Sequence, residues 1–431
     1  MAVIVWFKND LRIRDNAALI AAIQSNEPVI PLYCLDREQF KRRSFGFRKT
    51  GVFRAQFLLE SLEDLDRQLR SIGSGLLLKY GAAEDVLKEV VKLYSVKKVF
   101  TQSEIGFEEI EQIKELREQL QLVNCDIQLT SDNALLDISD FAMDVHQVPD
   151  IFTNFRQQVE KKWMVRDEFP LPDKLMSIDV PELKLPDLNE LGFDALKFDA
   201  RSVLKFKGGE SEGLKRVNYY FEEKGLVSTY KQTRNGMVEG DYSSKFSPWL
   251  AMGCLSARTI YHELKRYEDK HGANESTYWL IFELLWRDYF RLMMRKYPRQ
   301  FFLKQGLGKY PVKLHANNAI KLDRWINGKT DNAFINANML ELKYTGFMSN
   351  RGRQNVASYL CHHLESDWRY GAAYFEEMLI DYDVSSNWCN WAYLAGVGND
   401  PIKNRVFNPE KQAQQYDGEK KYRKLWGVFV L

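Results

Sequence analysis

The first 130 residues alternate short, β-branched apolar runs with longer stretches in which apolar residues recur at helical spacing. This alternation predicts an α/β domain with a doubly wound, Rossmann-like parallel sheet and helices between its strands. The predicted strands are Val3–Phe7, Val29–Cys34, Leu76–Tyr80, Lys97–Thr101 and Asp126–Leu129. The clearest predicted helices are Phe53–Ser71, which Gly73 would stop, and Glu108–Leu120.

The loop after the first predicted strand lacks the G-x-G-x-x-G pattern of dinucleotide-binding domains, and Lys8, Asn9 and Asp10 stand there instead. Those glycines let the main chain approach a pyrophosphate closely. An NAD-dependent dehydrogenase is therefore not expected.

The 431 residues are too many for one ordinary compact domain and predict two or three. Residues 131–200 hold 15 acidic against 7 basic residues and five prolines, which predicts an acidic connector over the surface rather than a packed layer. The α/β domain then covers residues 1–130, and an all-α domain covers residues 201–431. Its clearest predicted helices are Glu212–Glu223, Ala257–Tyr267, Tyr278–Lys296, Arg353–His363 and Ala372–Leu379.

Neither a basic leader nor about 18 uninterrupted apolar residues is readable, so we expect a cytoplasmic protein without a membrane partner. The five cysteines are far apart and form no C-x-x-C pair. No disulfide framework and no metal site is therefore predicted.

Positive charge is concentrated in residues 201–431, which hold 35 Lys and Arg against 25 Asp and Glu. Between Arg287 and Lys313, eight basic residues accompany one acidic residue, Asp288, and alternate with aromatic residues that include Tyr310. Basic groups interleaved with rings suit a polyanion whose bases can be splayed out. The alternative is a solvated, basic helix face.

A run of hydroxyl side chains and one cation, Ser243, Ser244, Lys245, Phe246 and Ser247, comes just before a predicted apolar helix. Hydroxyls and free main-chain N–H groups at a helix N-terminus can bind a phosphate. The alternative is ordinary N-capping by Ser247, with the following proline in the first turn.

The predicted helix Tyr278–Lys296 carries Glu283, Arg287, Arg291 and Arg295 at intervals of four, so these four side chains share one face. Trp279 and Trp286 lie seven residues apart on an adjacent stripe. This face is too polar for a simple core helix. The alternative is a row of glutamate and arginine pairs on a wet surface.

Residues 341–401 mix fixed polar groups with large rings, which suits an aromatic cofactor better than a plain core. Several motifs resemble those of the photolyase and cryptochrome flavoproteins, and their residues are similar to those of the DASH cryptochrome branch. These motifs are NRGRQNVAS, DYDVSSNW, AGVGNDP and FSPWLAMGCLS. The resemblance also covers VIVWFKNDLRIRDNAAL, KTGVFRAQFLLESL and PDIFTNFRQQVE, and so extends over nearly the whole chain.

The resemblance implies FAD as the cofactor. Asp381 and Arg353 match the ion pair beside the flavin ring, and the amide of Asn387 matches the position facing flavin N5, which favours repair over signalling alone. The implied cofactor-binding residues are Tyr230, Ser243, Ser244, Lys245, Phe246, Ser247, Arg287, Asn350, Arg353, Asp381, Asp383 and Asn387.

The resemblance also implies a lesion pocket for a pyrimidine dimer. Glu283, Trp286, Asn350 and Tyr393 are its implied catalytic residues, and a dry pocket would raise the pKa of Glu283. Double-strand-acting photolyases have tryptophan where Tyr393 stands, and the smaller ring predicts a weaker hold on a flipped dimer. The implied DNA-binding residues are Arg291, Arg295, Arg351 and Gln354.

Trp391 and Trp368 match two members of the tryptophan chain through which the family photoreduces its flavin, but His315 stands where the outermost tryptophan is expected. Three alternatives follow: photoreduction is slow, it ends on Tyr310 or another surface ring, or it depends on an external reductant that reaches the flavin directly. A second cofactor, 5,10-methenyltetrahydrofolate, is common in the family between the two domains, where Glu104 is the implied contact. The alternative for Glu104 is a plain first-turn acid.

We therefore expect a monomeric photolyase that repairs cyclobutane pyrimidine dimers under blue light, mainly in single-stranded or open DNA, by electron transfer from reduced FAD. The alternative is an FAD-based blue-light photoreceptor that binds nucleic acid and repairs little. RNA is a further candidate partner. A photolyase for (6-4) lesions fits less well, because the only adjacent histidines, His362 and His363, lie far in sequence from Trp286.

Overall fold

The computed structural model describes residues 2–130, 133–308, 313–402 and 405–428. Its N-terminal part contains one five-stranded sheet in the order β3-β2-β1-β4-β5, and all neighbouring strands pair in parallel. The strands are β1 (Val3–Phe7), β2 (Val29–Leu35), β3 (Leu77–Tyr80), β4 (Lys98–Gln102) and β5 (Asp126–Thr130). The predicted strands are thus all present, with ends that differ by at most one residue.

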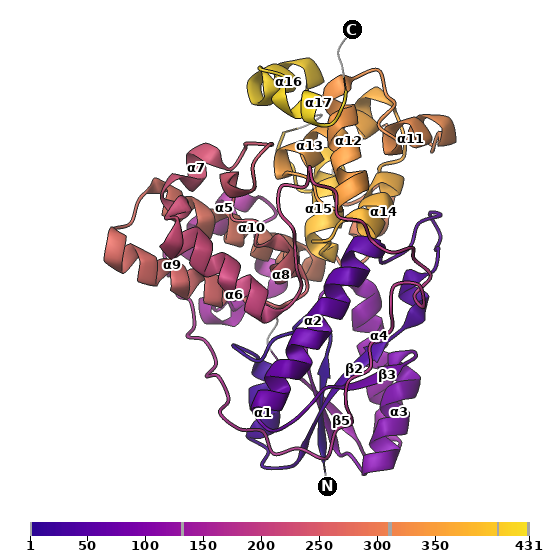
Figure 1. The fold of residues 1–431 in the computed structure, drawn as a ribbon, viewed down its shortest axis with the longest axis vertical. Helices are drawn as coiled ribbons and strands as arrows, with labels where there is room; N and C mark the ends of the chain where they lie inside the picture. Colours follow the sequence, from indigo (N-terminus) through magenta and orange to yellow (C-terminus); the bar gives the residue numbers. More distant parts are fainter. Residues whose placement is uncertain (1, 131–132, 309–312, 403–404, 429–431) are drawn as a thin grey trace.

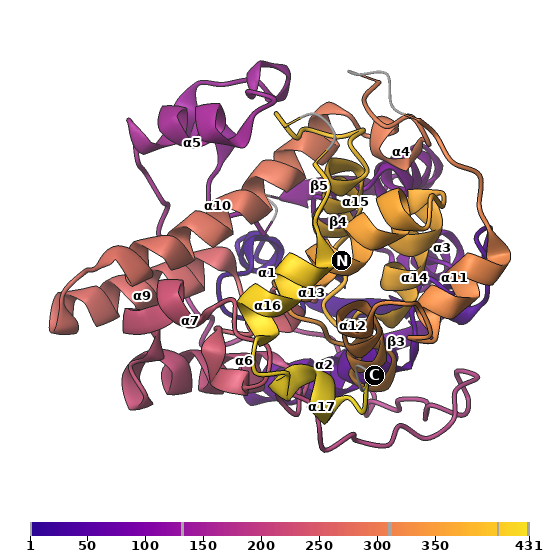
Figure 2. The same cartoon turned by 90° about the horizontal axis from the view of Figure 1, so that it is seen from above.

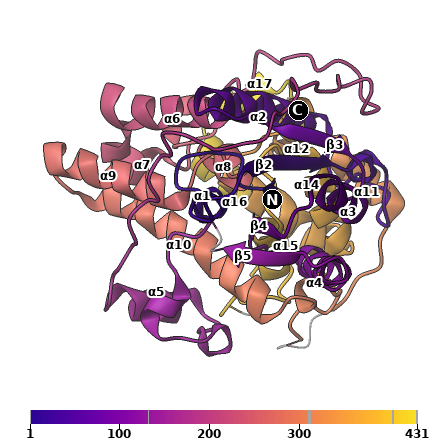
Figure 3. The same cartoon turned by 90° about the horizontal axis from the view of Figure 1, so that it is seen from below.

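Residues on β1 alternate between two apolar layers, as the period of two of a strand requires. Val3, Val5 and Phe7 pack toward α1 (Ala17–Ile23) and α2 (Val52–Ser71), whereas Ile4 and Trp6 pack toward α3 (Ala83–Tyr94) and α4 (Phe107–Gln121). Figure 3 shows α3 and α4 across the sheet from α1. The predicted doubly wound α/β fold is confirmed.

The rest of the chain is helical, and Figure 1 shows it as two groups above the sheet, with α6 to α10 on one side and α11 to α17 on the other. The predicted helices Glu212–Glu223 and Arg353–His363 each begin as an α-helix and end in a π-helical turn, Tyr219–Glu223 and Tyr359–His363. No helix of the described residues is long and apolar enough to cross a membrane. The α-helices are α5 (Phe152–Glu160), α6 (Glu210–Asn218), α7 (Tyr230–Thr233), α8 (Ser247–Ala251), α9 (Ala257–His271), α10 (Glu275–Lys296), α11 (Ala319–Ile326), α12 (Ala333–Thr345), α13 (Asn350–Ser358), α14 (Trp368–Met378), α15 (Val384–Leu394), α16 (Pro409–Asp417) and α17 (Lys421–Leu425).

The segment expected to be a surface connector contains one packed helix. Helix α5, which stands to one side of α10 in Figure 2, contacts α10 and buries Phe152, Phe155 and Val159. Beyond α5 the chain is extended and follows the β2 and β3 edge of the sheet, where Leu175 N donates to Ile72 O at 2.7 Å. Part of the segment therefore contributes to the core, because α5 has an apolar face at helical spacing that its many polar neighbours obscure in the sequence.

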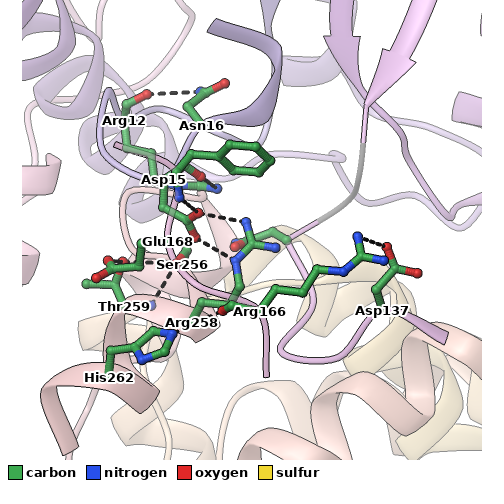
Figure 4. A network of polar contacts seen from close by, with 12 residues as sticks. Arg12, Asp15, Asn16, Asp137, Arg166, Glu168, Ser256, Arg258, Thr259 and His262 are labelled. Atoms are coloured by element: carbon green, nitrogen blue, oxygen red, sulfur yellow. Dashed lines mark hydrogen bonds and ion pairs between the residues drawn. The ribbon is translucent and has the colours of Figure 1, made fainter. Parts of the chain in front are cut away.

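A buried ion pair joins the sheet-bearing part to the helical part (Figure 4). Arg258 on α9 donates from Nε and Nη2 to the two carboxylate oxygens of Asp15 at 3.0 and 2.7 Å. Phe169 N also donates to this carboxylate, at 2.9 Å. Nearby, Gly253 has a φ of 69°, and a Cβ there would lie 2.0 Å from the Asn9 carbonyl oxygen, so the two parts meet with almost no space between their main chains.

Candidate functional site

A buried arginine holds the loop that precedes α8. Arg216 donates from Nε to the Ser244 carbonyl oxygen at 3.0 Å and from Nη2 to those of Gly240 and Ser243 at 3.1 and 3.3 Å. The C=O and N–H groups of a peptide unit point in opposite directions. The N–H groups of Ser244 and Lys245 therefore point away from Arg216.

Helix α8 begins at Ser247, and Phe246 occupies its N-cap position without a side-chain hydrogen bond to the first turn. The alternative in which Ser247 caps this helix is therefore wrong, although the proline does lie in the first turn as expected. Lys245, just before the cap, has a φ of 59°. A non-glycine residue in this left-handed region costs on the order of 1–3 kcal/mol and persists where the surroundings hold it.

The Lys245 side chain ends among buried groups. Its ammonium lies 5.1 Å from the centroid of the Phe347 ring, and among the described residues it has no hydrogen-bond partner. Burial lowers the pKa of Lys245 and raises that of the neighbouring Glu341, whose carboxylate accepts a hydrogen bond from Tyr422 at 2.6 Å. The ammonium keeps access to solvent although the side chain is buried, and it makes no hydrogen bond to the described residues, so the position can accept an added anion.

Arg353 on α13 forms an ion pair with Asp381, just after α14. Its Nη2 atom lies 2.9 and 2.8 Å from the two carboxylate oxygens, and its Nε donates to the Met348 carbonyl oxygen at 2.9 Å. The guanidinium also lies 5.5 Å from the Phe347 ring. Lys245 and Arg353 thus lie over the same aromatic ring, although they are more than 100 residues apart in the chain.

Asp383 caps α15 by accepting hydrogen bonds from Ser386 N and Ser385 Oγ at 2.7 and 2.6 Å. Burial alone would raise the pKa of Asp383, but Arg291, Arg287 and these hydrogen bonds outweigh it, and the pKa is lowered. The carboxylate therefore stays ionised. Arg287 is also anchored by hydrogen bonds from its guanidinium to the carbonyl oxygens of Asn133 and Leu250.

The prediction that Arg291 binds DNA is contradicted by its position. Its side chain is only 6% exposed, and Nη1 lies 3.6 Å from the Asp383 carboxylate. The spacing of four that places it on one face with Arg287 turns both toward α15, because α10 packs on that helix. The basic run is consequently not one solvated stripe, and Lys309 and Tyr310 within it lie outside the described residues.

The two asparagines expected at the flavin are placed differently. Asn387 on α15 is buried, and its Nδ2 atom donates to the Ala372 carbonyl oxygen of α14 at 3.0 Å, which fixes the orientation of the amide. Asn350 is exposed at the start of α13, one residue after Ser349, which caps that helix. Asn350 can therefore reach a ligand without breaking a packed contact.

Trp286 belongs to a cluster of rings built by three segments. It stacks on Phe152 of α5 at a centroid distance of 3.7 Å and meets Tyr393 of α15 edge-to-face at 6.4 Å. Glu283, one turn earlier on α10, forms an ion pair with Arg234. Burial raises the pKa of Glu283 even though Arg234 opposes the change, which is the predicted direction.

The remaining residues of the predicted site are more dispersed. Tyr230 is buried at the start of α7, and burial raises its pKa. Arg351 lies 4.6 Å from the Tyr416 ring and donates to Gln354 Oε1 at 2.8 Å. Arg295, near the end of α10, is exposed. The side chains of Arg351, Gln354 and Arg295 can contact a polyanion. Arg295, however, lies near the end of α10, away from Glu283.

A cavity of about 750 Å³ opens between the sheet-bearing and helical parts. Lys8 Nζ and Glu104 Oε1 lie 3.7 Å apart at its wall, and among the described residues neither atom has a hydrogen-bond partner. Burial raises the pKa of Glu104 to about 7. Buried polar atoms without partners are rare in folded proteins, so this wall is suited to a polar ligand.

Two family models cover most of the chain. The DNA photolyase model matches residues 3–173, and the model for the FAD binding domain of DNA photolyase matches residues 279–427. The cryptochrome DASH of Gloeobacter violaceus is 46% identical over 98% of this chain and 85% of its own length. The chain belongs to the DASH cryptochrome branch of the photolyase and cryptochrome family.

Solved structures of this family agree with the fold. A cryptochrome of Synechocystis matches with a TM-score of 0.94 and 44% identity, over 99% of this chain and 88% of that one. A class III photolyase from Agrobacterium tumefaciens matches with a TM-score of 0.83 and 26% identity, over 99% of this chain and 86% of that one. As a DASH cryptochrome, the protein is a flavoprotein with FAD as its cofactor and a role in blue-light DNA repair or photoreception.

The donor set fits FAD. The loop N–H groups and the unbonded ammonium of Lys245 suit its negatively charged pyrophosphate, and the Arg353 ion pair and the Asn387 amide offer polar contacts to a flavin ring. Sequence reasoning missed Arg216, Arg234 and Glu341, which orient or neutralise the expected residues. Nothing in the local sequence marks them, because each acts on a segment 24 or more residues away.

Proposed function

We propose that this DASH cryptochrome is a photolyase that repairs cyclobutane pyrimidine dimers, mainly in single-stranded or locally open DNA. FAD, once bound and reduced, supplies the light-driven electron to the dimer. The protein residues bind the lesion, hold the cofactor and exclude water. The observation that carries the proposal is the pairing of Trp286 with Tyr393 next to the Glu283 carboxyl.

The Trp286 and Tyr393 pair accounts for the proposed strand preference. A flipped dimer must leave its base stack, which costs a few kcal/mol in a duplex. Stacking on aromatic side chains offsets about 1–3 kcal/mol per base. Tyr393 presents a smaller ring than tryptophan, and its hydroxyl is 3.5 Å from Arg405, so this side of the pocket is a weaker stacking surface.

Glu283 is proposed to hold or share a proton with the dimer. Burial raises its pKa, so a larger fraction of the carboxyl is protonated at a given pH than in an ordinary glutamate. Arg234 limits this rise and fixes the orientation of the carboxyl. We assign Asn350, exposed at the start of α13, as a further contact to the lesion or cofactor.

The proposed FAD contacts follow the geometry described above. The loop from Ser243 to Ser247, oriented by Arg216, would receive the pyrophosphate, with Lys245 as its cation. Asp381, Arg353 and Asn387 would contact the flavin ring. We retain Tyr230, Arg287 and Asp383 as supporting residues around the cofactor, and Arg295, Arg351 and Gln354 as DNA contacts.

The 750 Å³ cavity is the proposed site of the second cofactor, 5,10-methenyltetrahydrofolate. Glu104 and Lys8 have unsatisfied polar atoms at its wall, and Arg43, Lys49 and Arg299 line it as well. A folate has hydrogen-bonding ring nitrogens and an anionic glutamyl tail, which match this mixture. When the folate is titrated with protein, Glu104→Gln should quench the folate fluorescence less than the wild type does. An unchanged titration would show that Glu104 does not contact the folate.

A photoreceptor with little repair activity is the second candidate function. The observation that favours it is His315 in place of an outer tryptophan, since altered electron exit changes how the cofactor responds to light. In this case DNA or RNA would be a binding partner rather than a substrate. The two candidate functions share the same cofactor site and differ in whether a bound pyrimidine dimer is repaired.

The experiment is repair of a defined thymine dimer by anaerobically reduced protein under blue light, with single-stranded and duplex oligonucleotides in parallel and a dark control. We expect restoration in the single strand and at least tenfold less in the duplex. A Tyr393→Trp variant should raise duplex repair relative to single-strand repair. No repair in either substrate by protein that holds reduced FAD would leave the photoreceptor function.

A further inference from the structure

Three tryptophans gather where α14 meets α15. A Cβ at Gly371 of α14 would lie 2.2 Å from the ring of Trp391, so that ring rests directly on the α14 main chain. Trp368 lies one turn earlier on α14, and its ring meets Trp388 edge-to-face at 5.8 Å. Trp388 and Trp391 are three residues apart on α15 and so share one face.

The route expected to lead outward from Trp368 is blocked chemically. His315 and Trp368 line one small cavity of about 30 Å³, so the imidazole stands where the next ring of the chain is expected. Imidazole is much harder to oxidise than indole. An electron vacancy on Trp368 therefore does not move onto His315, and the nearest indole in contact is Trp388.

Trp388 leads to a hydrogen-bonded tyrosine and a carboxylate. Its Nε1 atom donates to Tyr382 Oη at 3.2 Å, and the Glu376 carboxyl lies near this hydroxyl, where each group shifts the pKa of the other. Trp388, Tyr382 and Glu376 all line the 750 Å³ cavity between the two parts of the molecule. Arg54 lies 4.6 Å from the Tyr382 ring, which disfavours positive charge on that ring but not a neutral radical.

We propose that Trp388, Tyr382 and Glu376 form a proton-coupled electron relay that ends at the inter-domain cavity and replaces the exit lost at His315. The relay rests on the proposed function, because it supplies electrons for the photoreduction of the cofactor. It names two electron-transfer residues and one proton acceptor beyond Trp391 and Trp368.

The relay conserves charge and atoms at each step. An electron moves from Trp388 to oxidised Trp368, and a second moves from Tyr382 to oxidised Trp388. The phenolic proton of Tyr382 passes to the Glu376 carboxylate, which leaves a neutral tyrosyl radical and a carboxylic acid. In protein without bound folate, a small thiol that enters the cavity as a thiolate returns one electron, Glu376 returns the proton, and the thiol leaves as a thiyl radical.

A second aromatic branch does not reach the 750 Å³ cavity. Trp391 also meets Trp325 edge-to-face at 6.1 Å, and Trp325 meets Tyr374 at 5.8 Å. Trp325 is fully buried, and among the described residues that line the 750 Å³ cavity neither Trp325 nor Tyr374 is found. Oxidising a buried ring that does not reach a cavity leaves an unsolvated positive charge, so this branch is the unfavourable one. Tyr374 is thus a matched control.

Laser-flash absorption and freeze-quench electron paramagnetic resonance of the FAD-loaded protein test the relay, with dithiothreitol as the thiol. The wild-type protein should show a tyrosyl radical whose lifetime shortens as dithiothreitol rises. Tyr382→Phe should reduce the tyrosyl signal at least tenfold and leave a tryptophan radical, while Tyr374→Phe should behave as wild type. Trp388→Phe should remove the tyrosyl signal even where Tyr382 is intact.

A full tyrosyl signal in Tyr382→Phe, or no tyrosyl radical in the wild-type protein, would overturn the relay. The FAD content of each variant, measured by absorbance, checks that it is folded and loaded. Dimer repair by wild-type protein that has been reduced chemically in the dark does not use the relay. A failure of repair is therefore read separately from a failure of the radical experiment.

Discussion

Two buried charged clusters in this molecule differ in whether their hydrogen bonds are complete. In the ion pair of Asp15 and Arg258, both carboxylate oxygens are matched by guanidinium N–H groups. In the cluster of Lys245, Glu341, Arg353 and Asp381, here called the loop cluster, the Lys245 ammonium has no hydrogen-bond partner among the described residues.

The difference separates a structural role from a binding role. A buried pair with satisfied hydrogen bonds holds two parts of a protein together, and removing one partner leaves an uncompensated charge. A buried cation without such a partner costs stability until an anion arrives. The Asp15 and Arg258 pair should therefore affect folding, and the loop cluster should affect cofactor affinity.

The largest expected effect comes from breaking the complete pair. Arg258→Ala should lower the free energy of unfolding by about 3–5 kcal/mol, because the buried Asp15 carboxylate would lose the guanidinium that donates to both of its oxygens. Urea unfolding followed by circular dichroism measures this change. Arg166→Ala, which removes an exposed arginine paired with Asp137 and Asp140, is the control and should cost about 1 kcal/mol or less.

A loss below about 1 kcal/mol in Arg258→Ala would show that the two parts are held together chiefly by apolar contacts, and the contrast between the clusters would then fail.

Lys245→Ala should weaken FAD binding by roughly 10- to 100-fold, the effect of losing one hydrogen bond to a charged group at about 1.5–3 kcal/mol. The apoprotein should be no less stable, because the variant removes a charge that makes no hydrogen bond to the described residues. Titration of apoprotein with FAD measures the affinity. Lys215→Ala, on the exposed side of α6, is the matched control and should bind FAD as wild type. Equal affinity of the two variants would exclude Lys245 as the phosphate cation.

Glu341→Gln should change how stability depends on pH. The pKa of Glu341 is raised from 4.5 to about 7 in the fold, so the folded state holds this proton more tightly than the unfolded state. Its contribution is complete below pH 4.5 and is lost as the pH rises toward about 7. Glutamine keeps an acceptor for Tyr422 and does not titrate. Between pH 4.5 and 7, the free energy of unfolding of the wild type should therefore fall by roughly 1–2 kcal/mol more than that of the variant.

Urea unfolding of both proteins at several pH values between 4.5 and 7 measures this decline. Parallel curves for the wild type and Glu341→Gln would mean that Glu341 does not titrate in this range.

The smallest effect is expected at an exposed pair that belongs to neither cluster. Lys79 and Glu89 lie 2.8 Å apart on the surface of the α/β domain. Lys79→Ala should change the free energy of unfolding by about 0.5 kcal/mol or less, because water and salt screen such pairs. A loss above about 1 kcal/mol would mean that ion pairing stabilises this protein regardless of burial.

Much of the fold was readable because it depends on short-range periodicity. The alternation in β1 between Val3, Val5 and Phe7 on one face and Ile4 and Trp6 on the other requires only that a side chain reverses direction at each residue. Helix α5 escaped prediction because its three apolar residues stand among prolines and charges that predict a connector. The π-helical ends of α6 and α13 left no mark in the sequence.

The sequence by itself determined the doubly wound sheet, the helical C-terminal part and the family, since each rests on local patterns or long motifs. Tertiary structure alone decided which charged side chains find hydrogen-bond and ion-pair partners. Arg291 was expected at DNA and is instead buried beside Asp383, because the same face of α10 that carries it packs on α15. Arg216, Arg234 and Glu341 found their partners across long stretches of chain, and only the folded arrangement sets those distances.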